Sequence, residues 1–525
     1  MITHSVPTLI GVLIGITFLR SIAPLSFLYT CWNAYDYVVN GKYAHTPLLI
    51  TLHIYCSAEA VFLLFFVLYY RPHMQIEAVH PPLRTKAQRR QLFDKVHSEI
   101  TNPAQFISGW FRGAKIEDIG REQLREFLNW SFWEGRATAE DAEELDEYVR
   151  LSEEYAGVEL KEHGVARPLR LTLDPVEMDY RSLLWYGIIM LLDVVASVRF
   201  QTCGFEYHRT SWSSAWVFPP TLAALSTNKC SPSTHLSYWF RPHTSKTRHP
   251  ILFLHGVGIG LQSYVDFLHL LDVALNQHAA ADDKVGILAL EFLPISSRLT
   301  CPVLRRDVFN GQLLEILDKH AFEQVVLVNH SYGSIASSHI LTDDAVSARI
   351  SAVLSIDPVT ILLHLPDVAF NFTIRAPKKA NEWQLWYFAS KDPGISHTLG
   401  RHLFWYESVL WRDRIIELVN RGMNFTVSLS GQDLIVDTPA VARYLLVDDK
   451  PTPIVKSAED RQVMELQSSQ TDIEFDELTR RPWKGQGLEV LWWNDFDHAQ
   501  VMDDTESIAK LISVICQYCQ VKKRQ

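Results

Sequence analysis

The sequence lacks the cysteine pattern of a small disulfide-bonded protein. Its 7 cysteines are scattered through 525 residues and are odd in number, so they indicate no disulfide framework. Cys516 and Cys519 have the C-x-x-C spacing of some zinc and redox sites, but no second pair accompanies them. Two cysteines on one face of a terminal helix is the simpler interpretation. We therefore expect neither a metal nor a cofactor.

A basic surface is also missing, since the net charge is -11 and the isoelectric point lies near 6.0. This charge balance argues against nucleic acid as a partner. No internal repeat is found along the chain. The hydrophobic fraction of 47% and the charged fraction of 21% are those of an ordinary globular protein, and the length indicates two or three regions.

No lysine or arginine precedes the first long apolar run, residues 8–30. A basic start is typical of a cleaved signal peptide, so its absence favours a retained membrane helix, which needs about 20 residues. A second apolar run covers residues 47–70 and contains Glu59, for which Arg20 of the first run is a candidate partner. We predict that residues 1–75 form a membrane hairpin. Two buried helices of a soluble protein are the alternative.

Basic residues follow the second apolar run, and the positive-inside rule places that flank in the cytosol: Arg71, Arg84, Lys86, Arg89, Arg90 and Lys95. Residues 76–225 are predicted to be a helical region. A third apolar run within it, residues 182–198, is short for a span and carries Asp193. We expect this run to lie in the membrane surface or against the following domain, with a third span as the alternative.

Short apolar segments alternate with helical ones beyond residue 235. The predicted strands are residues 251–254, 285–290, 325–328, 350–356, 425–429 and 488–492, and a helix is predicted over residues 305–320. Such alternation is typical of an α/β fold with a mostly parallel sheet that helices cover on both faces. Catalytic groups in these folds gather at the carboxyl ends of the strands.

The segment from Val325 to Ser334 joins a buried strand to a helix through a turn of small residues. It is typical of the G-x-S-x-G nucleophile elbow, in which a strained turn projects a serine hydroxyl beyond the sheet. Ser331 is that serine and Gly333 is the second glycine, whereas Asn329 replaces the first. An ordinary serine–glycine turn after a buried strand is the alternative interpretation.

A serine nucleophile requires a base, and the base requires an orienting acid. Asp433 follows the predicted strand 425–429, and His498 follows the last predicted strand. The order serine, aspartate, histidine is the one found in α/β-hydrolase folds. Asp357, after the strand 350–356, is a rival acid. We prefer Asp433, because a Gly-x-Asp turn after the next strand is the commoner arrangement.

The carbonyl that a serine attacks also needs donors for the charge that develops on its oxygen. The sequence His-Gly-Val-Gly directly follows the strand 251–254 and precedes the elbow. The predicted oxyanion hole comprises Gly256, Val257, Gly258 and Tyr332, and the expected donors are the backbone N–H groups of Val257 and Tyr332. A plain glycine turn is the alternative for this motif alone.

With these motifs, residues 235–518 resemble the α/β-hydrolase superfamily. The longer sequence, including residues 365–369 and 381–390, resembles uncharacterised membrane-anchored fungal members of it. The resemblance implies a serine hydrolase with an α/β-hydrolase domain behind N-terminal transmembrane helices. It also implies that the chemistry uses Ser331, Asp433 and His498.

Residues 359–420 stand where that superfamily inserts its helical cap. Aromatic residues are dense there, and they line an acyl pocket or form the cap's own core: Phe370, Phe372, Trp383, Trp386, Tyr387, Phe388, Phe404, Trp405, Tyr406 and Trp411. We predict a membrane-anchored hydrolase of a lipid or other acyl ester. Its anchor is expected in the endoplasmic reticulum or another internal membrane, with the hydrolase domain in the cytosol. An acyltransferase, hinted at by the H-x4-D spacing from His498 to Asp503, and a non-catalytic protein of the same fold are the alternatives.

Overall fold

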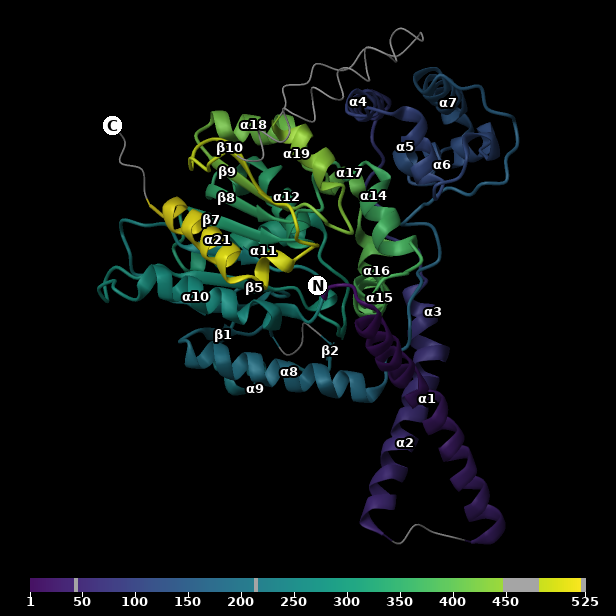
Figure 1. The fold of residues 1–525 in the computed structure, drawn as a ribbon, viewed down its shortest axis with the longest axis vertical. Coiled ribbons are helices and arrows are strands. Elements are labelled where there is room, and N and C mark those ends of the chain that lie inside the picture. Colours follow the sequence, from purple (N-terminus) through teal and green to yellow (C-terminus); the bar gives the residue numbers. More distant parts are fainter. Residues whose placement is uncertain (42–45, 212–215, 447–480, 521–525) are drawn as a thin grey trace.

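The computed structural model describes residues 1–41, 46–211, 216–446 and 481–520 (Figure 1). Its centre is an eight-stranded sheet in the order β1-β3-β5-β4-β7-β8-β9-β10. The strands are β1 (Glu206–His208), β3 (Ser237–Arg241), β4 (Ile251–Leu254), β5 (Ile287–Glu291), β7 (Val325–His330), β8 (Ile350–Ile356), β9 (Asn424–Ser430) and β10 (Leu488–Trp493). β3 runs antiparallel to β1 and β5, and the other neighbours are parallel.

This order and the single reversed strand define the α/β-hydrolase fold, so the predicted fold class is confirmed. The six predicted strands match β4, β5 and β7 to β10 closely. Two strands were not predicted from the sequence: β1, at one edge of the sheet, and β3, between β1 and β5. A short separate ribbon pairs β2 (Val217–Phe218) with β6 (Leu299–Thr300) in antiparallel register.

Helices cover both faces of the sheet, because successive strand residues point to opposite sides. Ile251 and Phe253 of β4 pack in one apolar cluster, and Leu252 and Leu254 pack in the other. The first cluster includes α8 (Leu183–Thr202), α10 (Val265–Asn276) and α21 (Thr505–Tyr518). The second includes α11 (Arg306–Lys319), α12 (Gly333–Leu341), α18 (Arg412–Asn420) and α19 (Thr438–Leu446). Short helices α9 (Ala223–Ser226) and α13 (Asp344–Ser347) join neighbouring elements.

A pair of long helices projects from the globular body (Figure 1). They are α1 (Val6–Asn40) and α2 (Pro47–Phe65), and α2 continues through a π-helical turn (Phe66–Tyr70) into α3 (Arg71–Met74). Both helices and α8 are long and apolar enough to cross a membrane, by length and composition. Such composition on exposed helices is what a bilayer requires.

The proposed pairing of Arg20 with Glu59 is wrong. Arg20 donates to Asp179 instead, with its Nε 3.0 Å from Oδ2. Glu59 accepts hydrogen bonds from the Tyr180 hydroxyl at 2.6 Å and the Leu183 backbone N–H at 2.8 Å. The segment before α8 therefore supplies partners for both ionisable residues. It lies far from them in the chain, so the sequence did not indicate these contacts.

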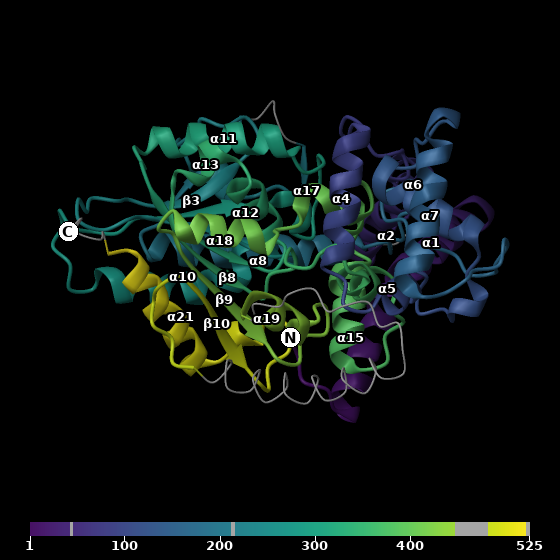
Figure 2. The ribbon, with the colours of Figure 1, turned by 90° about the horizontal axis from the view of Figure 1, so that it is seen from above.

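Four helices make a region of their own beside the sheet (Figure 2). They are α4 (Lys86–Ser98), α5 (Pro103–Trp110), α6 (Arg121–Trp133) and α7 (Ala142–Ala156). Thr138 and Asp141 form a capping box at the turn before α7. The apolar face of α7 is buried, with Tyr148 stacked on Phe93 of α4 at 4.2 Å between ring centroids.

The connection from β8 to β9 contains α14 (Pro366–Ala369), a π-helical turn (Phe370–Ile374), α15 (Ala380–Leu385), a second π-helical turn (Trp386–Ser390), α16 (Pro393–His402) and α17 (Trp405–Ser408). These helices lie between the sheet and α4 to α7 (Figure 2). Phe372 and Trp405 are buried in the same apolar cluster as Phe127 and Trp130 of α6. Of the two interpretations of the aromatic residues here, a packed core is the one that fits these two side chains.

Candidate active site

The elbow between β7 and α12 places Ser331 at the carboxyl end of a central strand. Its φ is +52°, in the left-handed region that residues with a Cβ seldom adopt. A Cβ on Gly333 would lie 2.3 Å from the carbonyl oxygen of Leu254, so no side chain fits there. The helix can approach β4 closely only with glycine at this position.

Asn329 occupies the first glycine position of the elbow motif. Its side chain is fully buried, and its Nδ2 donates to the hydroxyl oxygens of Ser337 at 3.1 Å and Ser355 at 2.9 Å. The amide thus ties β7 to α12 and to β8. A polar contact replaces the close packing that glycine provides, and the strained serine is still held in place.

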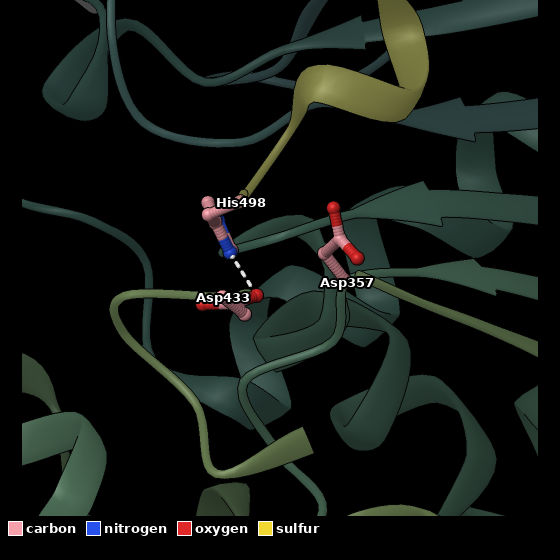
Figure 3. A group of neighbouring side chains, drawn as sticks. All are labelled: Asp357, Asp433 and His498. Atoms are coloured by element: carbon pink, nitrogen blue, oxygen red, sulfur yellow. Dashed lines mark hydrogen bonds and ion pairs between the residues drawn. The ribbon is translucent and has the colours of Figure 1, made fainter. Parts of the chain in front are cut away.

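Ser331, His498 and Asp433 form a continuous hydrogen-bonded chain. His498 Nε2 lies 2.8 Å from Ser331 Oγ. Figure 3 shows the second contact, in which His498 Nδ1 lies 2.6 Å from Asp433 Oδ2. The three residues follow β7, β10 and β9, whose carboxyl ends meet at one edge of the sheet. The geometry is that of a nucleophile, a base and an orienting acid.

The loops that carry the acid and the base are tied together by Asp497, which the sequence did not single out. Its Oδ1 accepts the backbone N–H of His498 at 2.7 Å and that of Leu434 at 2.9 Å. Asp433 is itself oriented, because its Oδ1 accepts two N–H groups of the following turn, from Ile435 and Val436. The Oδ2 of Asp433 is therefore directed at the imidazole.

The protonation of His498 is set by opposing influences. Burial lowers its pKa, but the negative charge and hydrogen bond of Asp433, with the charges of Asp357 and Asp497, raise the pKa to about 9. The surroundings thus stabilise the imidazolium form of His498. A base of this kind acts in its neutral form, so higher pH favours it.

Asp357, the rival acid, lies beside the pair but does not bond to the imidazole (Figure 3). Its carboxylate accepts from the backbone N–H of Ser430 at 3.0 Å, the Ser430 hydroxyl at 3.1 Å and the backbone N–H of Ala499 at 2.9 Å. Burial raises its pKa to about 6. Its contacts hold the end of β9 and the loop after His498 in position.

Ligand atoms of Asp357, Asp433 and His498 lie within 4.8 Å of one another, close enough to hold a metal ion. Both imidazole nitrogens are already engaged, one with the carboxylate of Asp433 and one with the hydroxyl of Ser331. A metal would have to displace one of these bonds. The donor set therefore fits a proton-transfer chain better than a metal centre.

The predicted oxyanion turn lies against the nucleophile. A Cβ on Gly256 would be 2.8 Å from Ser331 Cβ. The N–H of Gly256 donates to the Tyr264 hydroxyl at 3.0 Å, and that of Gly258 donates to the Ile295 carbonyl at 3.1 Å.

The N–H groups of Val257 and Tyr332 have no acceptor among the described residues. These are the two donors expected from the sequence, and both belong to the turns that flank Ser331. Unpaired N–H groups beside a nucleophile are what an oxyanion hole requires. The other two N–H groups of the turn are used to hold its shape.

His330 and Tyr264 form a buried pair behind the nucleophile that sequence reasoning missed. The Tyr264 hydroxyl lies 2.7 Å from His330 Nδ1, and it also accepts the Gly256 N–H. Burial, followed by the nearby charge of His498, lowers the pKa of His330 well below its ordinary range. His330 could have been suspected because it directly precedes Ser331 in the sequence. Nothing in the sequence singled out Tyr264.

The first residues of the described chain lie next to this site. The Gln500 side chain, two residues after His498, donates to the Met1 carbonyl at 2.8 Å. The Ile2 N–H donates to the Gln384 side chain of α15 at 3.0 Å. Asp503, the acid of the H-x4-D spacing, contacts the amino group of Met1 and not the triad. Ser331 and His498 are only 3% and 4% exposed, so both side chains are buried beneath their neighbours.

No protein-family model and no curated protein sequence matches this chain. Among solved structures, it is similar to the carboxylesterase CesB (YbfK) from Bacillus subtilis, with 8% identity and a TM-score of 0.35 over 63% of this chain and 99% of that one. It is also similar to naproxen esterase from Bacillus subtilis, with 11% identity and a TM-score of 0.35 over 62% of this chain and 97% of that one. A bacterial membrane phospholipase A matches with 10% identity and a TM-score of 0.36 over 64% of this chain and 94% of that one. The fold assignment accordingly stands on the strand order itself.

Proposed function

We propose that this protein is a membrane-anchored serine hydrolase that cleaves an ester, with Ser331 as nucleophile, His498 as base and Asp433 as orienting acid. The observation that carries the proposal is the hydrogen-bonded chain from Ser331 through His498 to Asp433, at 2.8 and 2.6 Å. Two unpaired N–H groups flank the serine, which adds the second requirement of acyl transfer.

The reaction follows from this geometry. Ser331 Oγ attacks the ester carbonyl carbon while its proton passes to His498 Nε2. The N–H groups of Val257 and Tyr332 donate to the carbonyl oxygen as it becomes negative. When the tetrahedral intermediate collapses, the imidazolium gives its proton to the departing alcohol and leaves an acyl-enzyme on Ser331. Water, deprotonated by His498, then releases the acid and restores the serine.

The anchor is assigned to α1 and α2, whose apolar side chains are widely exposed. The basic residues that follow the second run support a cytosolic hydrolase domain, and we propose that the membrane is an internal one, such as the endoplasmic reticulum. An enzyme held at a bilayer meets lipids at high local concentration. A lipid or other acyl ester is therefore the proposed class of substrate.

A fluorophosphonate probe, which forms a covalent bond with an activated serine, tests the proposal on the full-length protein in detergent. Labelling is expected for the native protein and should be lost in Ser331→Ala. Ser338→Ala is the matched control, because the Ser338 hydroxyl is buried on α12, the helix that follows Ser331, and has no hydrogen-bond partner among the described residues. Labelling that survives in Ser331→Ala, or that is absent from the native protein at pH 9, would exclude this nucleophile.

A further inference from the structure

α8 has one face fixed to the hydrolase domain. Phe200 stacks on Trp239 of β3, with 4.9 Å between ring centroids. Asp193 pairs with the buried guanidinium of Arg298 at 2.9 Å. Arg199 pairs with Asp266 of α10. These contacts fix the second half of α8, from Asp193 to Phe200, to the hydrolase domain, so α8 cannot cross a bilayer independently of the domain.

The opposite face of α8 is an exposed apolar stripe, composed of Leu184, Ile188, Leu191, Val195 and Val198. The residues recur at spacings of three and four, as one side of a helix requires. Leu191 is 62% exposed and Val198 is 54% exposed. No charged residue falls within the stripe, because Asp193 is turned toward Arg298. A contiguous apolar surface of this kind marks a contact site.

The start of α8, where the stripe begins, is bound to the hairpin. The N–H of Leu183, at the start of α8, donates to Glu59 of α2 at 2.8 Å, and Phe62 packs edge-on against Tyr186 at 5.8 Å. Glu59 lies twelve residues after Pro47, or about 18 Å along the helix at 1.5 Å per residue. The start of α8 thus meets α2 within the apolar part of α2, and α8 extends away from it in a transverse direction (Figure 1).

A bilayer that surrounds α2 at this level must also meet the stripe. We propose that α8 is a membrane-contact helix that lies flat, with the stripe at the boundary between headgroups and acyl chains, and does not cross the bilayer. The inference rests on the proposed membrane anchoring. It adds that the hydrolase domain is held against the lipid surface by a second contact and does not hang freely from the hairpin.

Depth-dependent quenching tests this on the full-length protein in phosphatidylcholine vesicles. In all variants the exposed cysteines Cys31, Cys230 and Cys301 are changed to serine. A fluorescent label is then placed at Leu191→Cys on the stripe. The matched control is Val308→Cys, an aliphatic residue 40% exposed on α11, which covers the other face of the sheet. Val61→Cys, 67% exposed on α2, reports on the anchor.

Lipids that carry a spin label high on the acyl chain should quench the label at position 191 at least about threefold more than the label at 308, and more than deeply labelled lipids do. Quenching at 61 but not at 191 would overturn the flat contact and leave the anchor intact, and the stripe would then face a protein. Strongest quenching at 191 by deeply labelled lipids would also overturn it. No quenching at 61 would overturn the anchor and the inference together.

Discussion

Exchange of a single oxygen for nitrogen at Asp433 should severely reduce the activity. In Asp433→Asn the side-chain carbonyl will keep the Oδ1 position, where it accepts the N–H groups of Ile435 and Val436. The amide NH₂ then faces His498 Nδ1, 2.6 Å away in the native protein. Because the amide donates to Nδ1, the imidazole must carry its proton on Nε2. The Nε2–H group then points at Ser331, and Nε2 cannot accept the serine proton.

The magnitude follows from two contributions. The rise in the pKa of His498 from 6.5 to about 9 means that its surroundings stabilise the imidazolium by about 3 kcal/mol, at about 1.4 kcal/mol per tenfold change. The charge of Asp433 is the largest favourable influence, so most of this is lost. The wrong tautomer adds to the loss, and comparable changes in other triads lower kcat by about 10⁴-fold. We expect a fall of 10³- to 10⁴-fold, roughly.

Asp357→Asn is the matched comparison, since it makes the same chemical change at a buried carboxylate beside the imidazole. There the amide can keep the two hydrogen bonds at Oδ2, from the Ser430 hydroxyl and the Ala499 N–H, and it loses the one from the Ser430 N–H. One unsatisfied buried donor costs about 1–3 kcal/mol of stability. We expect a lower melting temperature and a rate within about tenfold of native.

The assay is hydrolysis of a short-chain p-nitrophenyl ester at pH 9 by the full-length protein in detergent, with thermal unfolding measured in parallel. If folded Asp357→Asn is inactive while folded Asp433→Asn keeps most of its kcat, the assignment of the acid is refuted. Equal and small losses in both variants would refute the tautomer argument.

Two further predictions concern pH and the oxyanion turn. The kcat/KM should rise with pH up to about 9, because only the neutral form of His498 accepts a proton, and an activity that is flat from pH 6 to 9 would contradict this. The raised pKa also means that the folded state holds this proton more tightly, so its contribution to stability is complete below pH 6.5 and is lost as pH rises through about 9, as thermal unfolding across that range will measure. Gly256→Ala should lower kcat by about 10²-fold and should also lower the melting temperature, because the new Cβ would lie 2.8 Å from Ser331 Cβ and must displace the serine or the turn. A native kcat in this variant would show that the turn does not lie so close to Ser331.

Much of the fold could be predicted because its signals are local. The buried strands β4, β5 and β7 to β10 are short runs of apolar residues with turn residues at their ends, and this pattern is typical of buried strands. β1 and β3 were missed, because the first has three residues and the second lies in a segment rich in serine, threonine and proline. Whether such a short or polar segment forms a strand depends on the strands beside it more than on its own composition.

The candidate site also has some features that the local sequence predicts and others that depend on tertiary packing. The amino-acid sequence by itself determined the elbow around Ser331, the order of Ser331, Asp433 and His498, and the position of each at a strand end, because turn geometry and chain order are properties of short segments. The tertiary structure alone decided which carboxylate meets the imidazole. Asp357 and Asp433 both follow strands of the same sheet, and only the turn after Asp433 directs an oxygen at Nδ1. It also decided that Arg20 pairs with Asp179 and that α8 turns its apolar stripe outward. These pairings join residues far apart in the chain, and packing of the whole fold determines which of them come within a few ångströms.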